Sequence, residues 1–247
     1  MRLLAASANV EVRLPAADRR ACLDGVLAED PDVVGLQEFF LTAARTLSAY
    51  GEVRLSPGPL DLDREPGRYL WLGATFGDCV VGLRTDRFAV ESVHPLRLSR
   101  PGRAENPMRP WGLEPPRTSV LVRCRLLENA QPLSVISFHL VPGVQSRSAY
   151  RTDRPKLVAR HRAEAARIDE VVSRELGLGR TVLAMGDSNF DGFAIPGLTS
   201  AWSGHEKPGT HGERTIDDVF GPGRSEEVWT VRNASDHDAV FAAREIS

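Results

Sequence analysis

The sequence predicts a strand-rich α/β fold. Short apolar runs rich in valine and leucine recur along the whole 247-residue chain, and only three stretches carry helical patterning of any length. Hydrophobic residues make up 42% of the chain and charged residues 26%, which allows a substantial buried core. Because no repeat, low-complexity segment or linker divides the chain, we expect a single domain over residues 1–247.

The N-terminal elements are expected to form a β-α-β unit. Leu3–Ala8 is predicted as a strand, Ala16–Ala28 as a helix that ends before Pro31, and Asp32–Gln37 as a second strand. Apolar residues recur at helical spacing in the middle segment, whereas they are consecutive in the two segments predicted as strands.

The middle of the chain is predicted as an antiparallel meander of three strands, Tyr69–Phe76, Cys79–Arg84 and Phe88–Leu98. The dipeptide Gly77-Asp78 between the first two strands is the reverse of Asp-Gly, which is favoured in hairpin turns. Ser99–Pro116 holds five prolines in eighteen residues, so we expect an irregular loop there.

The C-terminal half is expected to combine strands with one long helix. Thr118–Leu127 and Leu133–Leu140 are predicted as a strand pair, and Arg154–Leu176 is the longest helical candidate. Gly177 and Gly179 follow a helix and precede a strand, the reverse of a phosphate-binding loop, so we interpret them as a helix stop. Four further strands are predicted at Thr181–Met185, Ile216–Phe220, Glu227–Val231 and Ala239–Ala243.

The charge balance excludes some classes of protein without indicating a partner. With 31 Lys+Arg against 33 Asp+Glu the net charge is -2, which argues against a strongly basic nucleic-acid coat protein and against an acidic disordered tail. Nearly all of the positive charge is arginine, which together with the many alanines is typical of a GC-rich genome. The number of arginines is therefore a weak indicator of function.

The three cysteines are expected to be buried free thiols. Cys22, Cys79 and Cys124 are odd in number and widely spaced, which fits neither a disulfide framework nor a zinc site. No run approaches the ~18 apolar residues that a membrane-spanning helix needs, and the first residues lack the apolar core of a signal peptide. We therefore expect a cytoplasmic protein without a transmembrane segment, and we infer no obligate protein partner.

Polar side chains occur at six places where a predicted apolar strand begins or ends, which is where open α/β sheets gather functional groups. Any one of them has a structural explanation, as a cap, a turn residue or a buried histidine. Together they offer four carboxylates, two amides and two histidines, a set that suits Mg²⁺ or Mn²⁺ rather than structural zinc. The residues are Asn9, Glu38, His139, Asp187, Asn189, Asp217, Asp236 and His237.

The order and spelling of these motifs resemble the endonuclease/exonuclease/phosphatase family, also called DNase I-like. The similarity runs from Asn9 to His237 and includes Gln37-Glu38, Ser-Phe-His-Leu around His139, Gly-Asp-Ser-Asn around Asp187, Ile-Asp at Asp217 and Ser-Asp-His at the end. The resemblance implies a four-layered α/β sandwich with two facing mixed, largely antiparallel sheets. It also implies metal-dependent hydrolysis of a phosphoester.

The resemblance implies a role for each residue. Glu38 is expected as the principal metal ligand, with Asn9 and Asp236 close by, and Mg²⁺ or possible Mn²⁺ as the ion. His237, held by Asp217, is expected to act as the general base or to orient the phosphate. Asp187 is expected to align or deprotonate the attacking water, and Asn189 to donate a hydrogen bond to the phosphate. His139 is expected to donate a proton or to stabilise charge. A carboxylate partner for His139 cannot be assigned from the sequence.

A basic stretch directly follows His139 and offers candidate substrate contacts. Arg147, Arg151 and Arg154 could form a positive rim for a polyanion, and Arg109 in the proline-rich loop could add to it. The alternative is a loop followed by the solvated face of an arginine-rich helix. Only 6% of the residues are aromatic and they form no patterned cluster, which tempers a nucleic-acid assignment.

Three functions follow from these observations. The first is a metal-dependent phosphodiesterase or nuclease. The second is a phosphatase or phosphodiesterase that acts on a small molecule, a lipid headgroup or an inositol phosphate. The third is a catalytically silent binding module that keeps the fold, which the filled catalytic positions disfavour.

Overall fold

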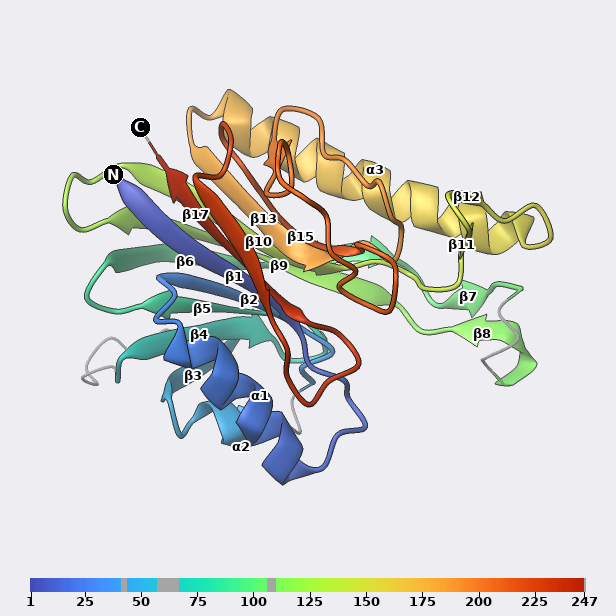
Figure 1. The fold of residues 1–247 in the computed structure, drawn as a ribbon, viewed down its shortest axis with the longest axis horizontal. Helices are drawn as coiled ribbons and strands as arrows, with labels where there is room; N and C mark the ends of the chain where they lie inside the picture. Colours follow the sequence, from blue (N-terminus) through green and yellow to red (C-terminus); the bar gives the residue numbers. More distant parts are fainter. Residues whose placement is uncertain (41–43, 57–66, 106–109, 247) are drawn as a thin grey trace.

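The computed structural model describes residues 1–40, 44–56, 67–105 and 110–246. Figure 1 shows two large sheets that face each other, with helix α3 (Pro155–Gly177) outside one sheet and helices α1 (Ala16–Ala28) and α2 (Ala44–Leu47) outside the other. The layers are therefore helix, sheet, sheet and helix, which confirms the predicted four-layered sandwich.

Within the described ranges the first sheet has seven strands, and it contains the predicted β-α-β unit. Strand β1 pairs in parallel with β2 and antiparallel with β17. The parallel pairing requires a crossover, which α1 provides. In spatial order the strands are β16 (Glu227–Val231), β17 (Ala239–Glu245), β1 (Arg2–Asn9), β2 (Val33–Gln37), β5 (Val80–Arg84), β4 (Tyr69–Ala74) and β3 (Gly51–Ser56).

The second sheet has six strands in the part of the chain that the structure describes, and it also contains a parallel pair joined by a helix. Its central strands, β10 and β13, are parallel and are connected through α3, while the other pairs are antiparallel. In spatial order the strands are β14 (Thr199–Ser200), β15 (Asp217–Gly221), β13 (Thr181–Asp187), β10 (Pro132–His139), β9 (Arg117–Leu126) and β6 (Phe88–Ser99).

Three of the four apolar clusters among the described residues hold the layers together. The largest lies between the sheets and includes Leu3 and Val81 of the first sheet with Val122 and Leu183 of the second. A second cluster packs α1 on the first sheet. A third packs α3 on the second sheet, where Ile168 contributes to the buried surface. Each predicted helix therefore buries its apolar face against one sheet.

The structure corrects the predicted meander. Strands β4 and β5 pair as expected, but β6 leaves the first sheet and pairs with β9 in the second. The run of apolar residues indicates a strand but does not indicate which sheet it joins. The sequence analysis also lacked α2 and β3, which are short and follow the second predicted strand.

The predicted proline-rich loop contains short regular pieces. Strands β7 (Gly102–Arg103) and β8 (Leu113–Glu114) form a two-residue ladder, and a 3-10 turn lies at Pro110–Gly112. A second small ladder joins β11 (Gln145–Ser146) and β12 (Ala149–Tyr150). Arg109 lies outside the described residues.

Two expectations from composition can be compared with the structure. Cys22, Cys79 and Cys124 are free and buried, as predicted. Within the described ranges, no helix combines the length and the apolar character that crossing a membrane requires.

Candidate active site

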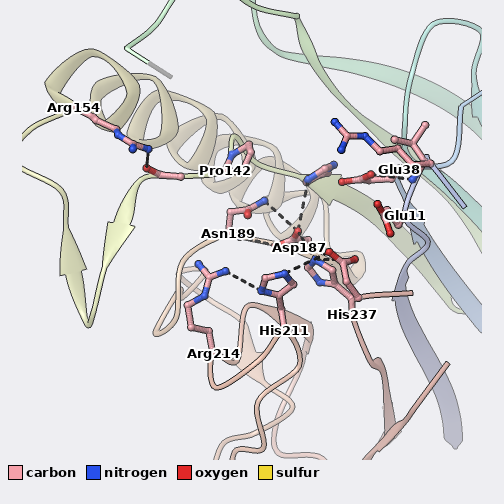
Figure 2. A pocket seen from close by; sticks show the side chains of 14 residues that line it. Glu11, Glu38, Pro142, Arg154, Asp187, Asn189, His211, Arg214 and His237 are labelled. Carbon is pink, nitrogen blue, oxygen red and sulfur yellow. Dashed lines mark hydrogen bonds and ion pairs between the residues drawn. The ribbon is translucent and has the colours of Figure 1, made fainter. Parts of the chain in front are cut away.

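A cavity of about 460 Å³ opens at the edge where the central strands of both sheets end (Figure 2). The parallel registers bring the predicted residues there, because Asn9 is opposite Gln37 in the first sheet and His139 is opposite Asp187 in the second. Six of the eight predicted catalytic and metal-binding residues line the cavity: Glu38, His139, Asp187, Asn189, Asp236 and His237. Asn9 and Asp217 are buried behind them.

The Asp187 carboxylate lies at the centre of the polar contacts. Its Oδ2 accepts hydrogen bonds from the amide of Asn9 and from the amide of Asn189, both at 3.1 Å. The same oxygen lies 3.6 Å from Nε2 of His139 and 3.9 Å from Nε2 of His237. Residues from both sheets therefore converge on one carboxylate oxygen.

Asn189 uses both amide hydrogens inside the protein. Its Nδ2 donates to the carbonyl oxygen of Leu140 at 3.0 Å as well as to Asp187, and its backbone N–H donates to Oδ1 of Asp187 at 2.7 Å. A hydrogen bond from this amide to a phosphate would have to replace one of these contacts. In the structure Asn189 therefore fixes the Asp187 carboxylate.

Buried His161 supports the same segment from helix α3. Its Nε2 lies 2.7 Å from the carbonyl oxygen of Ser188, and its Nδ1 lies 3.1 Å from the hydroxyl of Tyr150. Burial lowers the pKa of His161, which favours a neutral ring that donates through Nε2. The His161 ring thus connects Ser188, which lies between Asp187 and Asn189, to helix α3.

His237 is held by Asp217 through the contact that the sequence predicted. Nδ1 of His237 donates to Oδ2 of Asp217 at 2.8 Å, and Asp217 is completely buried. Burial alone would lower the pKa of His237, but the hydrogen bond and charge of Asp217, with the charge of Asp187, raise it to about 10. The pair therefore favours the protonated imidazole.

The carboxylate partner of His139, which could not be assigned from the sequence, is Asp78. Oδ2 of Asp78 lies 3.1 Å from Nδ1 of His139, and Nη1 of Arg117 lies 3.3 Å from the same oxygen. Burial would raise the pKa of Asp78, but the hydrogen bond and charge of His139 and the charge of Arg117 lower it. In the sequence, Gly77-Asp78 has the spelling of a turn, and only the packing of the two sheets brings it to His139.

The oxygen atoms around Asn9 fit a divalent cation. Oδ1 of Asn9 is buried and has no hydrogen-bond partner among the described residues, although its Nδ2 is bonded to Asp187. A buried acceptor without a partner is rare in proteins and indicates a missing ion or water. The donors nearby are carboxylates and an amide, which are the ligands that Mg²⁺ prefers.

The acidic residues of this region are of two kinds: Glu38 stands apart, whereas Asp187, Asp217 and Asp236 belong to clusters of potential metal ligands. Glu38 follows β2 with a positive φ of 59°, an uncommon conformation for this residue, and its Oε2 accepts a hydrogen bond from the backbone of Val12. Potential ligand atoms come within 4.8 Å of one another in two groups, His211 with Asp236 and His237, and Asp187 with Asp217 and His237. Glu38 lines the same cavity but belongs to neither group.

Four ionisable residues of the cavity wall were not predicted from the sequence. Glu11, Arg13, His211 and Arg214 lie in loops, where no strand end drew attention to them. The His211 ring lies 4.5 Å from the His237 ring, and its Nε2 lies 3.5 Å from Oδ2 of Asp236.

The predicted arginine rim is only partly assembled. Arg154 lines the cavity and donates to the carbonyl oxygen of Gly143 at 3.1 Å. Arg151 is outside the cavity lining and pairs with Asp153 at 2.6 Å. Arg147 is exposed, and it too does not line the cavity.

Comparisons with known proteins agree with this description. Residues 6–237 match the model of the Endonuclease/Exonuclease/phosphatase family. A comparison with curated protein sequences finds no significant match.

Solved structures share the fold at low sequence identity. An endonuclease/exonuclease/phosphatase from Bacteroides vulgatus is 15% identical with a TM-score of 0.68, and 100% of each chain is covered. TDP2 of D. rerio, in complex with a single-strand DNA product, is 17% identical with a TM-score of 0.64, and 98% of each chain is covered. The mannosyl-6-phosphatase of Bacteroides thetaiotaomicron is 17% identical with a TM-score of 0.65, covering 97% of this chain and 98% of the other.

The family match covers nearly the whole chain and includes the motifs from which the resemblance was inferred. The structural similarities extend over both sheets and confirm the predicted DNase I-like fold. The chain therefore belongs to the Endonuclease/Exonuclease/phosphatase family, whose members are enzymes that hydrolyse phosphoester bonds.

Proposed function

We propose that this protein is a divalent-metal-dependent phosphodiesterase with Mg²⁺ as its ion, which Mn²⁺ can replace. The observation that carries the proposal is the buried Oδ1 of Asn9, which has no hydrogen-bond partner among the described residues. It lies beside the Asp187 carboxylate, which the imidazoles of His139 and His237 approach. An oxygen-rich site next to two histidine–aspartate pairs suits charge neutralisation and proton transfer at a phosphate.

Glu38, Asn9 and Asp236 would hold the ion. When bound, it would neutralise charge on a phosphate oxygen and help to orient the substrate. Asn9 contributes an amide oxygen whose direction is fixed by the hydrogen bond from its Nδ2 to Asp187. Asp236 is the most accessible of the three, with a side chain that is 55% exposed.

The other residues of the site have complementary tasks. His237 is oriented through Nδ1 by Asp217 and directs Nε2 towards Asp187, where a protonated ring would donate to a phosphate oxygen. His139 is oriented through Nδ1 by Asp78 and presents Nε2 on the other side of Asp187. Asp187 orients the attacking water and accepts its proton as the phosphorus–oxygen bond forms. The leaving alkoxide takes a proton from an imidazole or from solvent.

The first candidate substrate is a phosphodiester, of which nucleic acid is one class. TDP2 of D. rerio holds a single-strand DNA product on the same fold, which supports that class. The second candidate is a phosphatase or phosphodiesterase for a small molecule, a lipid headgroup or an inositol phosphate. The cavity favours this second candidate, since about 460 Å³ is typical of small-molecule sites and Arg147 and Arg151 do not line it.

The first test measures hydrolysis of an activated aryl diester, plasmid DNA, RNA and an inositol phosphate with Mg²⁺, with Mn²⁺ and with a chelator. We expect metal-dependent turnover that falls by about 100-fold or more in Glu38→Gln and in Asp236→Asn, because each loses a ligand. Asp238→Asn is the matched control, since Asp238 lies two residues from Asp236 and pairs with Arg232 outside the cavity. Turnover that persists in chelator and in Glu38→Gln would overturn the proposal.

A further inference from the structure

Three arginines line the cavity, Arg13, Arg154 and Arg214, and of these Arg13 is exposed. Arg154 and Arg214 are both half-buried, and neither is in an ion pair with a carboxylate in the part of the chain that the structure describes. Neighbouring arginines differ, since Arg151 pairs with Asp153 and Arg160 pairs with Glu164. Arginine in a pocket without a counter-charge is well suited to bind an anionic group.

The position of Arg154 is built into the backbone. Its Nη1 donates to the carbonyl oxygen of Gly143, a residue with a φ of +79°. A Cβ added at Gly143 would lie 3.2 Å from the same nitrogen, closer than an ordinary contact. The left-handed backbone and the close approach both require glycine here. The guanidinium is thus held at the cavity wall with its other nitrogen atoms unpaired in the described structure.

Arg214 is positioned by a tight turn. A bridge between His211 and Arg214 closes the turn, and Gly212 at its tip has a φ of +61°. Nη2 of Arg214 lies 2.9 Å from Nδ1 of His211, which acts as the acceptor because arginine can only donate. One nitrogen of the guanidinium orients the residue, and the rest of the fork is left for a ligand.

Both arginines lie on the same side of the cavity. Figure 2 shows Arg154 and Arg214 with Pro142 on one side, Glu38 on the opposite side, and Asp187 between them. The reacting phosphate of the proposed function would lie beside Asp187. A group that reaches from there towards Arg154 and Arg214 is a different part of the substrate.

We propose that Arg154 and Arg214 form a subsite for a second phosphate group, so that the substrate is a small phosphoester with two phosphates. This inference rests on the proposed function of the cavity. Two guanidinium groups match the charge of a phosphate dianion, and the fork of each one matches its oxygen atoms.

The surroundings favour a small bisphosphate over a polynucleotide. A polynucleotide would continue beyond the cavity, where it would need further cations along its backbone. Arg151 is neutralised by Asp153, and the chain as a whole has a net charge of -2. Arg147 is exposed and does not line the cavity, whereas Arg154 and Arg214 line it, so the two proposed phosphate contacts lie inside the cavity.

The test uses two pairs of ligands that differ by one phosphate: adenosine 3′,5′-bisphosphate with adenosine 5′-monophosphate, and fructose 1,6-bisphosphate with fructose 6-phosphate. Binding to the full chain is measured by titration calorimetry and, in Mg²⁺, as competitive inhibition of aryl diester hydrolysis. In at least one pair we expect the bisphosphate to bind about tenfold tighter, or more, than the monophosphate. The reason is that its second phosphate gains charge-assisted hydrogen bonds.

The variants identify where the second phosphate binds. Arg154→Gln and Arg214→Gln should each reduce the preference for the bisphosphate, and circular dichroism checks that each one folds. Lys156→Gln is the matched control, since it removes a positive charge from the same helical turn at a side chain that is 70% exposed. The control should keep the preference of the parent.

Three results would overturn the subsite. The parent could bind bisphosphates and monophosphates equally well. The arginine variants could weaken both ligands by the same factor, which would mean that the arginines contact the reacting phosphate. A ten-residue oligonucleotide could bind tighter than either bisphosphate with a steep salt dependence, which would indicate nucleic acid instead. If calorimetry shows the preference while no hydrolysis is found, the proposed function fails and the subsite stands.

Discussion

At the scale of residues, the two histidines of the site have the same orientation but different surroundings. Each uses Nδ1 to contact a buried aspartate and directs Nε2 towards Asp187. Asp78 shares its charge with Arg117, whereas Asp217 has His237 as its cationic partner. The charge of Asp217 is therefore available to stabilise the imidazolium of His237, which explains the raised pKa of that ring.

The sequence predicted the residues at strand ends but not Asp78. His139 and Asp187 follow apolar strands, and strand ends in an α/β sheet meet at one edge. Asp78 lies in a turn that its own spelling explains, and its contact with His139 depends on how the two sheets pack. Such a contact between distant segments leaves no local signal in the chain.

Asp78→Asn is expected to lower kcat by about 10- to 100-fold, as losses of a supporting carboxylate commonly do. The amide can still contact His139, but it no longer supplies the charge that orients and stabilises the ring. The measurement is kcat and KM across pH, with Asp86→Asn as control, because Asp86 is an exposed partner of Arg84 at the opposite end of strand β5. An unchanged kcat would show that Asp78 has no part in the reaction.

At the scale of elements, helix α3 is attached to its sheet by buried carboxylates as well as by apolar contacts. Glu175 accepts two hydrogen bonds from Arg123 at 2.8 Å and one from Ser134 at 2.9 Å. Glu164 accepts from the hydroxyl of Ser99 and from the backbone of Val141. The spacing of apolar residues predicted this helix, yet glutamate is usually on the solvated face, so these contacts could not be predicted.

Glu175→Gln is expected to destabilise the protein at pH 7 and to have little effect near pH 2. Burial would raise the pKa of Glu175, but Arg123 and Ser134 lower it to about 2. The ionised form is therefore favoured by folding, and its contribution of about 3 kcal/mol is present above pH 4.5 and lost as the pH falls towards 2. Urea unfolding at several pH values measures the difference.

The control for this variant is Glu170→Gln, because Glu170 is on the same helix with a side chain that is 64% exposed and pairs with Arg167. Exposed pairs of this kind contribute little, so the control should unfold like the parent. A destabilisation by Glu175→Gln that is the same at pH 7 and pH 3 would mean that packing, not ionisation, is responsible.

At the scale of the whole molecule, the two sheets share one core. The central cluster contains residues of β1 and β5 from the first sheet and of β9, β10, β13 and β15 from the second. The chain also crosses between the sheets twice, from β5 to β6 and from β15 to β16. The sequence predicted most strands, but their division between two sheets was established only by the structure, because the apolar runs are alike in both.

We expect the chain to unfold in one cooperative transition, consistent with the prediction of a single domain. Leu183→Ala, in the central cluster, should lower the midpoint by the same amount in far-ultraviolet circular dichroism and in tryptophan fluorescence, at a cost of about 2–5 kcal/mol. Leu127→Ala is the control, since Leu127 is 56% exposed. Two separated transitions would contradict a single cooperative unit.

The shared core also determines how the cavity can move. Rotating one sheet away from the other would expose the central cluster to water, so the strand ends that hold Asn9, His139 and Asp187 keep their relative positions. The charges of the site are thus preorganised before a substrate arrives, and little reorganisation energy is spent during the reaction. Adaptation to different substrates is left to the bordering loops, and changes of specificity can accumulate there without altering the central chemistry.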